Sequence, residues 1–397
     1  MMKRFIPLML IVAMPALAAD PAPGTRFRVD VSDLPAPFAT PSVANPADVV
    51  ARPPGAGLKL PPGWRATLFA TGLDHPRNLL VLSDNSVLVA EQRFDRLTRL
   101  VDGDGNGIAD SRTTLAAGFD EPFGLAERDG EIWVADTKAV WALPWRAGED
   151  KAGRRRQVTA DGALGDDRGH STRSLVLHPD GSRFYVGIGS RGNVAEEAEP
   201  RATVRVFAMD GSGGRSFASG LRNPVGMAFR PGSTELWAVV NERDGLGDEL
   251  VPDYLTQVVE SGFYGWPYAY LGPHPQPGLG PKAADKVAAT RVPDILFRAH
   301  SAPLGLAFAH GDAFVGLHGS WNRSEPIGYM VARVPFKDGK PVGHYEAFAT
   351  GFMAGPHAVW GRPVGVAAGT DGALYVADDA GRTVWKLIYS PSTSRME

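Results

Sequence analysis

Two short polar stretches contain residues that could perform acid–base and electrostatic chemistry. His170 lies in Gly-His-Ser-Thr-Arg-Ser-Leu, directly before an apolar run. A histidine titrates near neutral pH and can serve as a general base, although a loop histidine is often merely solvated. Arg222 and Asn223 directly precede a later apolar run. A fixed arginine can stabilise negative charge that develops during a reaction, so these three residues are candidates for one site.

Two further stretches are rich in oxygen ligands that suit a hard cation. Residues 241–250 combine carboxylates with glycines, and backbone carbonyls in such a loop could hold calcium. Residues 102–110 place oxygens at the first, third, fifth and ninth positions of an EF-hand-type loop, although Thr113 replaces the glutamate expected at the twelfth. A structural calcium and an ordinary Asx-rich turn are both compatible with this loop. Its candidate ligands are Asp102, Asp104, Asn106 and Asp110.

A recurring phrase in the sequence predicts the elements that position these residues. A proline or its substitute leads into apolar residues, then a turn rich in Gly, Asp or Asn, then a second apolar strand. The six copies begin at Pro76, Pro122, Thr172, Pro224, Pro303 and Pro363. Such hairpins, repeated about every fifty residues, must stack on their neighbours to bury both faces. The sequence therefore predicts an all-β fold, a six-bladed β-propeller, with a sandwich or separate β-domains as the competing architecture.

The regular spacing of the copies is interrupted once. Between the fourth and fifth copies, an insertion from about Gly245 to Arg298 is expected to add a long loop region. Long insertions of this kind usually belong to the functional face. The insertion also contains Tyr-Gly-Trp-Pro-Tyr at residues 264–268.

The N-terminal residues predict export. Lys3 and Arg4 precede an apolar run at residues 5–14 and the small-residue site Ala-Leu-Ala at 16–18, the pattern of a secretory signal peptide. The expected organisation is a signal peptide at 1–19, a Pro-rich arm at 20–57, the propeller at 58–390 and a tail at 391–397. No apolar stretch is long enough to span a bilayer, so a secreted and periplasmic protein without a transmembrane segment is expected.

Composition excludes several kinds of chemistry. The chain has no cysteine, which rules out disulfides, thiolate zinc sites, iron–sulfur clusters and c-type haem attachment. An oxidoreductase of this sequence would therefore need a non-covalent cofactor. Its 41 basic and 44 acidic residues nearly balance, so no nucleic-acid partner is indicated.

These motifs, taken in order, resemble a known family. A loop histidine before the third copy, Leu-Arg-Asn-Pro-Val-Gly opening the fourth, Gly-Asp-Glu-Leu and then Tyr-Gly-Trp-Pro are similar to the soluble glucose/sorbosone dehydrogenases. Those enzymes use pyrroloquinoline quinone (PQQ). The resemblance extends from Leu58 to Tyr389. Leu-His-Gly-Ser-Trp-Asn-Arg at 317–323 and Gly-Arg-Pro-Val-Gly-Val at 361–366 look like the sorbosone dehydrogenase branch.

The resemblance implies PQQ and Ca²⁺ as cofactors and a sugar or related polyol as substrate. His170 would take the hydroxyl proton while a hydride passes to PQQ, and Arg222 would stabilise the charge on the quinone oxygen. Asn223 would hydrogen-bond the cofactor, and Arg362 would pair with a PQQ carboxylate. Backbone carbonyls near Arg243 and Asp244 would hold the calcium ion. Electrons would leave to a quinone or a small redox protein.

The chain also departs from the glucose-oxidising members. They carry an acidic residue where this chain has Gly169, so Asp166 and Asp167 are the candidates to orient the imidazole. They have Gly-Pro in the calcium loop, where this chain has Arg243 and Asp244. A cofactor-contacting lysine on their fifth blade has no equivalent here. The candidate replacements and further cofactor contacts are His318, Arg323, Arg93 and Arg96.

Two other functions are compatible with a propeller of this size. A calcium-dependent lactonase would need a central metal held by side-chain Glu, Asn and Asp, whereas the starts of the copies offer mostly arginine and histidine. A non-catalytic binding module would not need polar residues gathered at those positions. The sequence therefore favours the PQQ-dependent sugar dehydrogenase over both.

Overall fold

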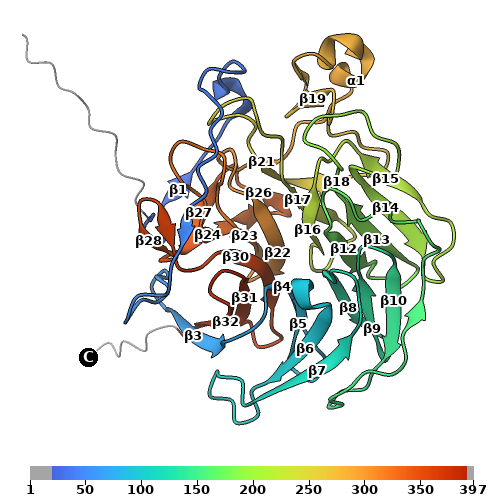
Figure 1. Cartoon of the computed structure of the whole chain (residues 1–397), viewed down its shortest axis with the longest axis vertical. Coiled ribbons are helices and arrows are strands. Elements are labelled where there is room, and N and C mark those ends of the chain that lie inside the picture. The colour runs from blue at the N-terminus through green and yellow to red at the C-terminus, as the bar shows by residue number, and fades with distance from the viewer. Residues whose placement is uncertain (1–19, 391–397) are drawn as a thin grey trace, which may run out of the picture.

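The computed structural model describes residues 20–390, and strands dominate that range, as the all-β prediction requires. Six larger sheets of the described residues follow one another along the chain and are arranged around a common centre (Figure 1). The first sheet contains β4 (Pro76–Val81), β5 (Val87–Glu91), β6 (Arg96–Val101) and β7 (Ser111–Ala117). The second contains β8 (Gly124–Arg128), β9 (Glu131–Ala135), β10 (Val140–Pro144) and β11 (Arg156–Gln157). The third contains β12 (Arg173–Leu177), β13 (Arg183–Ile188), β14 (Thr203–Ala208) and β15 (Arg215–Ser219).

The fourth sheet contains β16 (Pro224–Phe229), β17 (Leu236–Val240), β18 (Tyr254–Val258) and β21 (Ile295–Leu296). The fifth contains β22 (Pro303–Ala309), β23 (Asp312–Leu317), β24 (Met330–Val334), β27 (Tyr345–Ala349) and β1 (Arg26–Phe27). The sixth contains β30 (Pro363–Ala368), β31 (Leu374–Asp378), β32 (Thr383–Tyr389) and β3 (Trp64–Ala70).

Small elements complete the described chain. The short strands are β2 (Asp48–Val49), β19 (Ala269–Tyr270), β20 (His274–Pro275), β25 (Phe336–Lys337), β26 (Lys340–Pro341), β28 (Met353–Gly355) and β29 (Ala358–Val359). The helical segments are η1 (Val31–Asp33), η2 (Gln92–Phe94), η3 (Gly280–Lys282) and α1 (Ala284–Ala288). Within residues 20–390, no helix has the length and apolar character that crossing a membrane requires.

The apolar runs are buried on both faces because each sheet packs between two neighbours. In β5, Val87 and Val89 face a core shared with the sixth sheet, whereas Leu88 and Ala90 face a core shared with the second. This alternation follows from the two-residue period of a strand. Comparable cores lie between every successive pair of sheets. Double burial explains why these strands are continuously apolar rather than alternating.

Glycines near the starts of the inner strands let neighbouring sheets approach closely. A Cβ on Gly124 would lie 2.6 Å from the carbonyl oxygen of Arg173, and one on Gly365 would lie 2.6 Å from that of Arg77. A Cβ on Gly305 would collide with the backbone of Val364. Backbone-to-backbone packing of this kind is possible only without a side chain. The inner strands therefore form a closed ring.

Strands from the beginning and the end of the six sheets pair with each other in the sixth sheet. β3 pairs with β32 in an antiparallel register that runs from Trp64 opposite Tyr389 to Ala70 opposite Val384. The sixth sheet therefore combines the beginning and the end of the repeated part of the chain (Figure 1).

Two sequence-based expectations differ from the structure. Residues 245–298 are not simply an inserted loop region, because they contain β18 and β21, the two outer strands of the fourth sheet. The excursion beyond the sheet lies between these strands and contains β19, β20, η3 and α1. The Pro-rich arm also makes specific contacts, since β1 pairs with β27 and β2 pairs with β29. The expected signal peptide at 1–19 and tail at 391–397 lie outside the described residues.

Candidate active site at the starts of the inner strands

The starts of several inner strands meet at one place. Phe123, Val225, Leu304 and Val364 lie at the start of β8, β16, β22 and β30, and they form one buried cluster. Polar residues that directly precede these positions therefore gather at one end of the ring. Among them are Asn223 before β16 and Arg362 before β30.

The surroundings of His170 leave its imidazole free to accept a proton. Its Nδ1 lies 2.7 Å from the carbonyl oxygen of Ser190, which can only accept a hydrogen bond, so Nδ1 carries the hydrogen. Nε2 then holds the free lone pair of a neutral imidazole. Burial, the larger cause, and the charge of Arg222 together lower the pKa of His170 to about 4. The histidine is therefore neutral at ordinary pH.

The predicted orienting carboxylates do not contact His170. Asp166 instead pairs with three guanidinium groups, those of Arg168, Arg191 and Arg201. Arg168 and Arg201 hold the pKa of Asp166 well below its usual range. The suggestion that Asp166 orients the imidazole is wrong, because a backbone carbonyl already performs that task.

Arg222 is fixed by the loops that follow two neighbouring strands. Its Nε donates to the carbonyl oxygen of Asn193 at 3.2 Å, and one terminal nitrogen donates to the side-chain oxygen of Asn193 at 3.0 Å. The other terminal nitrogen donates to the carbonyl oxygen of Glu242 at 2.8 Å. The guanidinium has five N–H donors, so these contacts orient it without using all of them.

Asn193 also connects Arg222 to Asp244. Its Oδ1 accepts the backbone N–H of Asp244 at 2.9 Å, and its Nδ2 donates to the carbonyl oxygen of Asp244 at 2.8 Å. The indole N–H of Trp266 donates to the Asn193 carbonyl oxygen at 2.9 Å. The Tyr-Gly-Trp-Pro motif therefore supports the loop that holds Arg222.

Asp244 is the acidic group nearest to Arg222. A carboxylate oxygen lies 3.8 Å from Arg222, the other carboxylate oxygen lies 3.4 Å from Nδ1 of His300, and Asn322 donates to it. Burial acts to raise the pKa of Asp244, but His300 and Arg222 outweigh it, so the pKa is lowered. The carboxylate is therefore ionised and reduces the cost of burying Arg222.

The two predicted calcium residues have different environments. The side chain of Arg243 is fully buried, and it bonds Glu242, Gln276 and the carbonyl oxygen of Ala269. It belongs to the interior, so only its backbone could face a ligand. The Asp244 carbonyl already accepts the bond from Asn193, but a carbonyl oxygen has a second lone pair.

A second cluster surrounds Asp379 and joins the fifth, sixth and first sheets. Its carboxylate lies 2.9 Å from Nε2 of His318, 2.7 Å from Arg77 and 3.6 Å from Nε2 of His75. His318 and Arg77 hold the pKa of Asp379 far below its usual range despite burial. Arg362 reaches the same cluster, since its Nε donates to the carbonyl oxygen of His318 at 3.0 Å. His318 and Arg362, both predicted to contact the cofactor, thus lie in one cluster.

Three further residues predicted to contact the cofactor lie outside the two contact networks described above or at their edge. Arg96 is held by Glu91 and Asp74 at 2.9 Å, and it is an internal ion pair rather than a free cation. Arg323 points its terminal nitrogens at the carbonyl oxygen of Asp248 and the carboxylate of Glu249. Arg93 is exposed on η2 and influences the pKa of His75, so it lies at the rim of the second cluster.

Several buried polar atoms at this end have no partner among residues 20–390. They are Oδ1 of Asn223, Oδ1 of Asn322, Nδ1 of His75 and Nε of Arg77. Buried polar groups are almost always satisfied, so these four atoms are candidates to contact a polar ligand. A Cβ on Gly189 would clash with Asn223 and lie 2.6 Å from the Cβ of His170, which places these two side chains next to each other.

Sequence reasoning missed Asn193, Asp379 and Arg77. The repeat itself contained a signal for two of them, because Arg77 follows the proline that opens the first copy and Asp379 directly follows β31, the second strand of the sixth. Asn193 lies in a loop outside the recurring phrase, and no spacing rule identified it.

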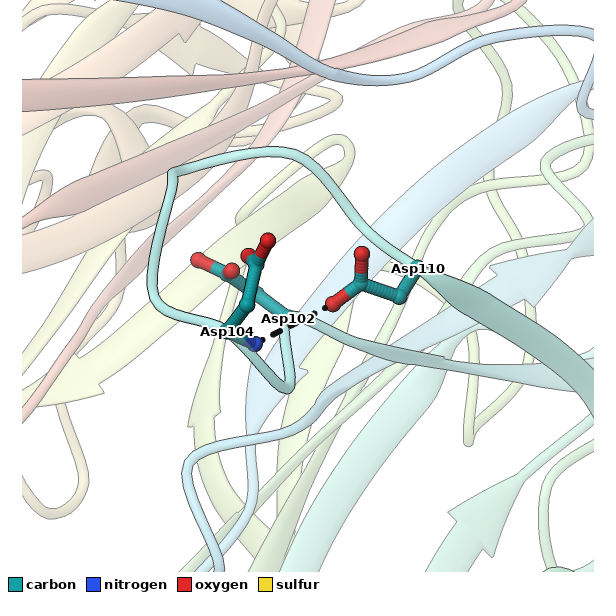
Figure 2. Close-up of side chains that lie close together, drawn as sticks. All are labelled: Asp102, Asp104 and Asp110. Atoms are coloured by element: carbon teal, nitrogen blue, oxygen red, sulfur yellow. Dashed lines mark hydrogen bonds between the residues drawn. The ribbon is translucent and has the colours of Figure 1, made fainter.

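The predicted acidic loop is separate from these clusters and lies between β6 and β7. The carboxylates of Asp102, Asp104 and Asp110 lie close together (Figure 2). Each offers one oxygen, and these oxygens lie within 4.8 Å of one another. The fourth predicted ligand, Asn106, donates to Asp104 at 2.8 Å through its side-chain nitrogen.

Comparison with protein families now identifies the chain's relatives. The family model described as TrAA12-like matches residues 58–256 and 281–390. The chain belongs to the TrAA12-like family. The residues between the two matched ranges, 257–280, include β19 and β20, whereas α1 lies in the matched part of this TrAA12-like chain.

Individual relatives of this TrAA12-like chain agree with the family. A pyrroloquinoline quinone-dependent pyranose dehydrogenase of Coprinopsis cinerea is 25% identical over 402 residues, which cover 81% of this chain and 53% of that protein. The chain therefore spans about half the length of that relative. The predicted resemblance to PQQ-dependent sugar dehydrogenases is confirmed.

Solved structures show the same fold. The holo form of the pyranose dehydrogenase PQQ domain from Coprinopsis cinerea has a TM-score of 0.73 at 22% identity, covering 86% of this chain and 99% of that one. A calcium structure of a Trichoderma reesei family AA12 protein has a TM-score of 0.72 at 22% identity, covering 88% and 98%.

Proposed function

We propose that this TrAA12-like protein is a sugar oxidoreductase that uses PQQ and calcium, with His170 as its general base. The observation that carries the proposal is the neutral imidazole of His170, whose side chain lies next to that of Asn223 with its unpartnered Oδ1 and close enough to the fixed cation Arg222 for that charge to lower its pKa. Family membership and the pyranose dehydrogenase among the relatives support the reaction class.

The donors and acceptors at this end of the ring suit PQQ and a hard cation. PQQ carries three carboxylates, and the half-buried guanidinium groups of Arg77 and Arg362 can bind them in a planar geometry. Oδ1 of Asn223 and Oδ1 of Asn322 are free acceptors that could face the cofactor or its cation. Calcium prefers such oxygens, together with the backbone carbonyls near Arg243 and Asp244. Bound there, PQQ would supply the two-electron oxidant.

The protein's own residues then divide the remaining work. His170 accepts the proton of the substrate hydroxyl at Nε2, while Ser190 holds the imidazole by its Nδ1–H. Arg222 keeps a preorganised positive charge in a site largely shielded from water, where its electrostatic effect is strong. Asn193 keeps Arg222 and Asp244 in place.

We also propose that the six larger sheets are the blades of a six-bladed β-propeller and that the body spans residues 58–390. Support comes from the inter-sheet cores, from the pairing of β3 with β32, and from the fold shared with the pyranose dehydrogenase PQQ domain. Export to the periplasm after removal of residues 1–19, and a quinone or small redox protein as electron acceptor, complete the proposal. The sugar or sorbosone-like substrate remains a prediction.

Reconstitution tests the function directly. Purified protein is mixed with PQQ and Ca²⁺, and a panel of aldoses, polyols and sorbosone-like aldehydes is tested with an artificial electron acceptor. We expect oxidation of at least one substrate, dependent on both PQQ and Ca²⁺. Lactone hydrolysis with no PQQ requirement would replace the proposal with the lactonase function.

His170→Ala tests the base. We expect turnover to fall by roughly two to four orders of magnitude, the usual contribution of a positioned base, while PQQ still binds. His357→Ala, a change at an exposed histidine of the β28–β29 turn, is the matched control and should leave turnover unchanged. Retention of most activity by His170→Ala would show that another group is the base.

A further inference from the structure

The acidic loop between β6 and β7 has a second feature besides its three carboxylates. The side chain of Asp102 is only 9% exposed, and its Oδ1 is buried with no hydrogen-bond partner in residues 20–390. Its Oδ2 accepts the backbone N–H of Gly107 at 3.0 Å. A buried carboxylate oxygen without a donor is costly, and here it lies beside the carboxylate of Asp104 (Figure 2).

We propose that this loop binds a structural calcium ion through Asp102, Asp104, Asn106 and Asp110. The ion would satisfy Oδ1 of Asp102 and remove the repulsion among three carboxylates within 4.8 Å of one another. All available ligands are oxygens, and their arrangement suits calcium better than magnesium, because magnesium requires a near-ideal octahedron.

The twelfth position limits the affinity. Thr113 lies inside β7 with Arg99 as its cross-strand partner, so it does not replace the bidentate glutamate of an EF-hand loop. We therefore expect a dissociation constant on the order of 10⁻⁴ to 10⁻³ M, as in extracellular calcium modules.

The loop also contacts the sheet that closes the ring. The backbone N–H of Ala109 donates to the carbonyl oxygen of Phe69 in β3 at 2.8 Å. The ammonium of Lys386 in β32 lies 3.5 Å from Oδ2 of Asp102. A calcium ion in the loop would therefore stiffen the contact between the first sheet and the paired strands β3 and β32, and its effect should be on stability.

Calcium titration of the PQQ-free protein tests the proposal independently of the function. The double variant Asp104→Asn/Asp110→Asn changes two exposed side chains, so it should fold. We expect it to bind one equivalent of Ca²⁺ fewer than wild type by calorimetry, and to lose most of the rise in melting temperature that Ca²⁺ gives wild type. Asp371→Asn, at an exposed carboxylate 3.9 Å from Lys386 but outside the loop, is the control and should behave as wild type.

Two results would overturn the proposal. One is the same calcium stoichiometry and melting-temperature rise in the double variant as in wild type. The other is an equal response to Mg²⁺, which would exclude selectivity for calcium. When both variants are reconstituted with PQQ at saturating Ca²⁺, the double variant should retain sugar oxidation, so failure of the loop site and failure of the proposed function are separable.

Lys386→Gln provides a test of opposite sign. The lysine places a positive charge next to Asp102, so its removal should tighten calcium binding several-fold. An unchanged dissociation constant would contradict the role of Asp102 as a ligand.

Discussion

At the scale of single residues, His170 is a base whose pKa has been adjusted by burial rather than by a carboxylate. Its Nδ1–H is held by the carbonyl oxygen of Ser190, which fixes the tautomer but adds no negative charge. Burial and the charge of Arg222 outweigh the Ser190 hydrogen bond and the charge of Asp244, which act to raise the pKa, and lower it to about 4. A weaker base results, but one that is in its accepting form over the whole neutral range.

This pKa predicts the position of the acid limb in the pH profile. The neutral form of His170 is required, so kcat/KM should rise as pH increases through about 4 and be independent of His170 above about 5. The rates of reconstituted enzyme from pH 3 to 8 measure this. A limb centred near 6.5, the ordinary histidine value, would contradict the assigned environment.

Arg222→Gln extends that experiment. Loss of the cation removes one cause of the lowered pKa, so the acid limb should move to higher pH while the overall rate falls. Arg77→Gln is the comparison, because Arg77 belongs to the Asp379 cluster and is not among the causes of the His170 shift. Its limb should stay in place even if cofactor retention weakens.

Residue identities in this site were predictable only where the repeat placed them. His170, Arg222, Asn223 and Arg362 all precede inner strands, and the structure brings each to the same end of the ring. Arg96 could not be assigned correctly from position alone, because its role depends on Glu91 and Asp74, which satisfy its guanidinium locally. Ion-pair partners are set by side-chain direction, which spacing does not determine.

At the scale of elements, the end of β13 controls how closely two site residues approach. Gly189 directly follows β13, and its missing side chain leaves room for His170 and Asn223. The absence of a side chain at Gly189 therefore allows His170 and Asn223 to lie next to each other. Predicted strands gave the correct hairpins, but they could not reveal this contact, which depends on the register between neighbouring sheets.

Gly189→Ala should damage the site without removing any functional group. The added methyl would displace Oδ1 of Asn223 or the imidazole, so we expect at least a tenfold loss of kcat/KM with a circular dichroism spectrum like that of wild type. Gly192→Ala is the matched control in the same loop, because its Cβ would meet only Glu197 at an ordinary 3.6 Å. Equal activity in the two variants would contradict the proposed arrangement of His170 and Asn223.

The Pro-rich arm shows a second limit of prediction at this scale. Proline content indicated an extended arm, but it did not indicate that Asn45 donates to the carbonyl oxygens of Arg323 and Ser324 at 3.2 and 2.8 Å. The arm thus braces the loop that carries Asn322. Composition describes the conformation of such a segment but not where it packs.

At the scale of the whole molecule, close backbone packing between the inner strands of neighbouring sheets holds the ring together. Gly305 has no room for a side chain, because a Cβ would collide with the backbone of Val364 in the next sheet. The six copies could be counted in the sequence, whereas the outer strands β18 and β21 were hidden within an apparent insertion. Short outer strands carry little periodicity, so only their pairing reveals them.

Gly305→Ala should therefore destabilise the entire protein. Overpacking against backbone typically costs about 1–3 kcal/mol, and the backbone here cannot move without shifting a sheet. We expect a melting temperature lower by several degrees in calorimetry. Gly355→Ala is the control, since nothing lies within 4 Å of its Cβ position and its melting temperature should match wild type. Equal melting temperatures for both variants would show that the inner strands can separate without penalty.

The pairing of β3 with β32 has a consequence for the order of events during synthesis. Trp64 pairs with Tyr389, which is synthesised more than three hundred residues later, so the ring cannot close before the last sheet has been synthesised. Contacts so distant in sequence make folding slow, and the early sheets must remain unclosed in the meantime. If the proposed export begins before the last strand has been made, the ring cannot have closed when the chain enters the membrane. Its ring would then form only on the far side.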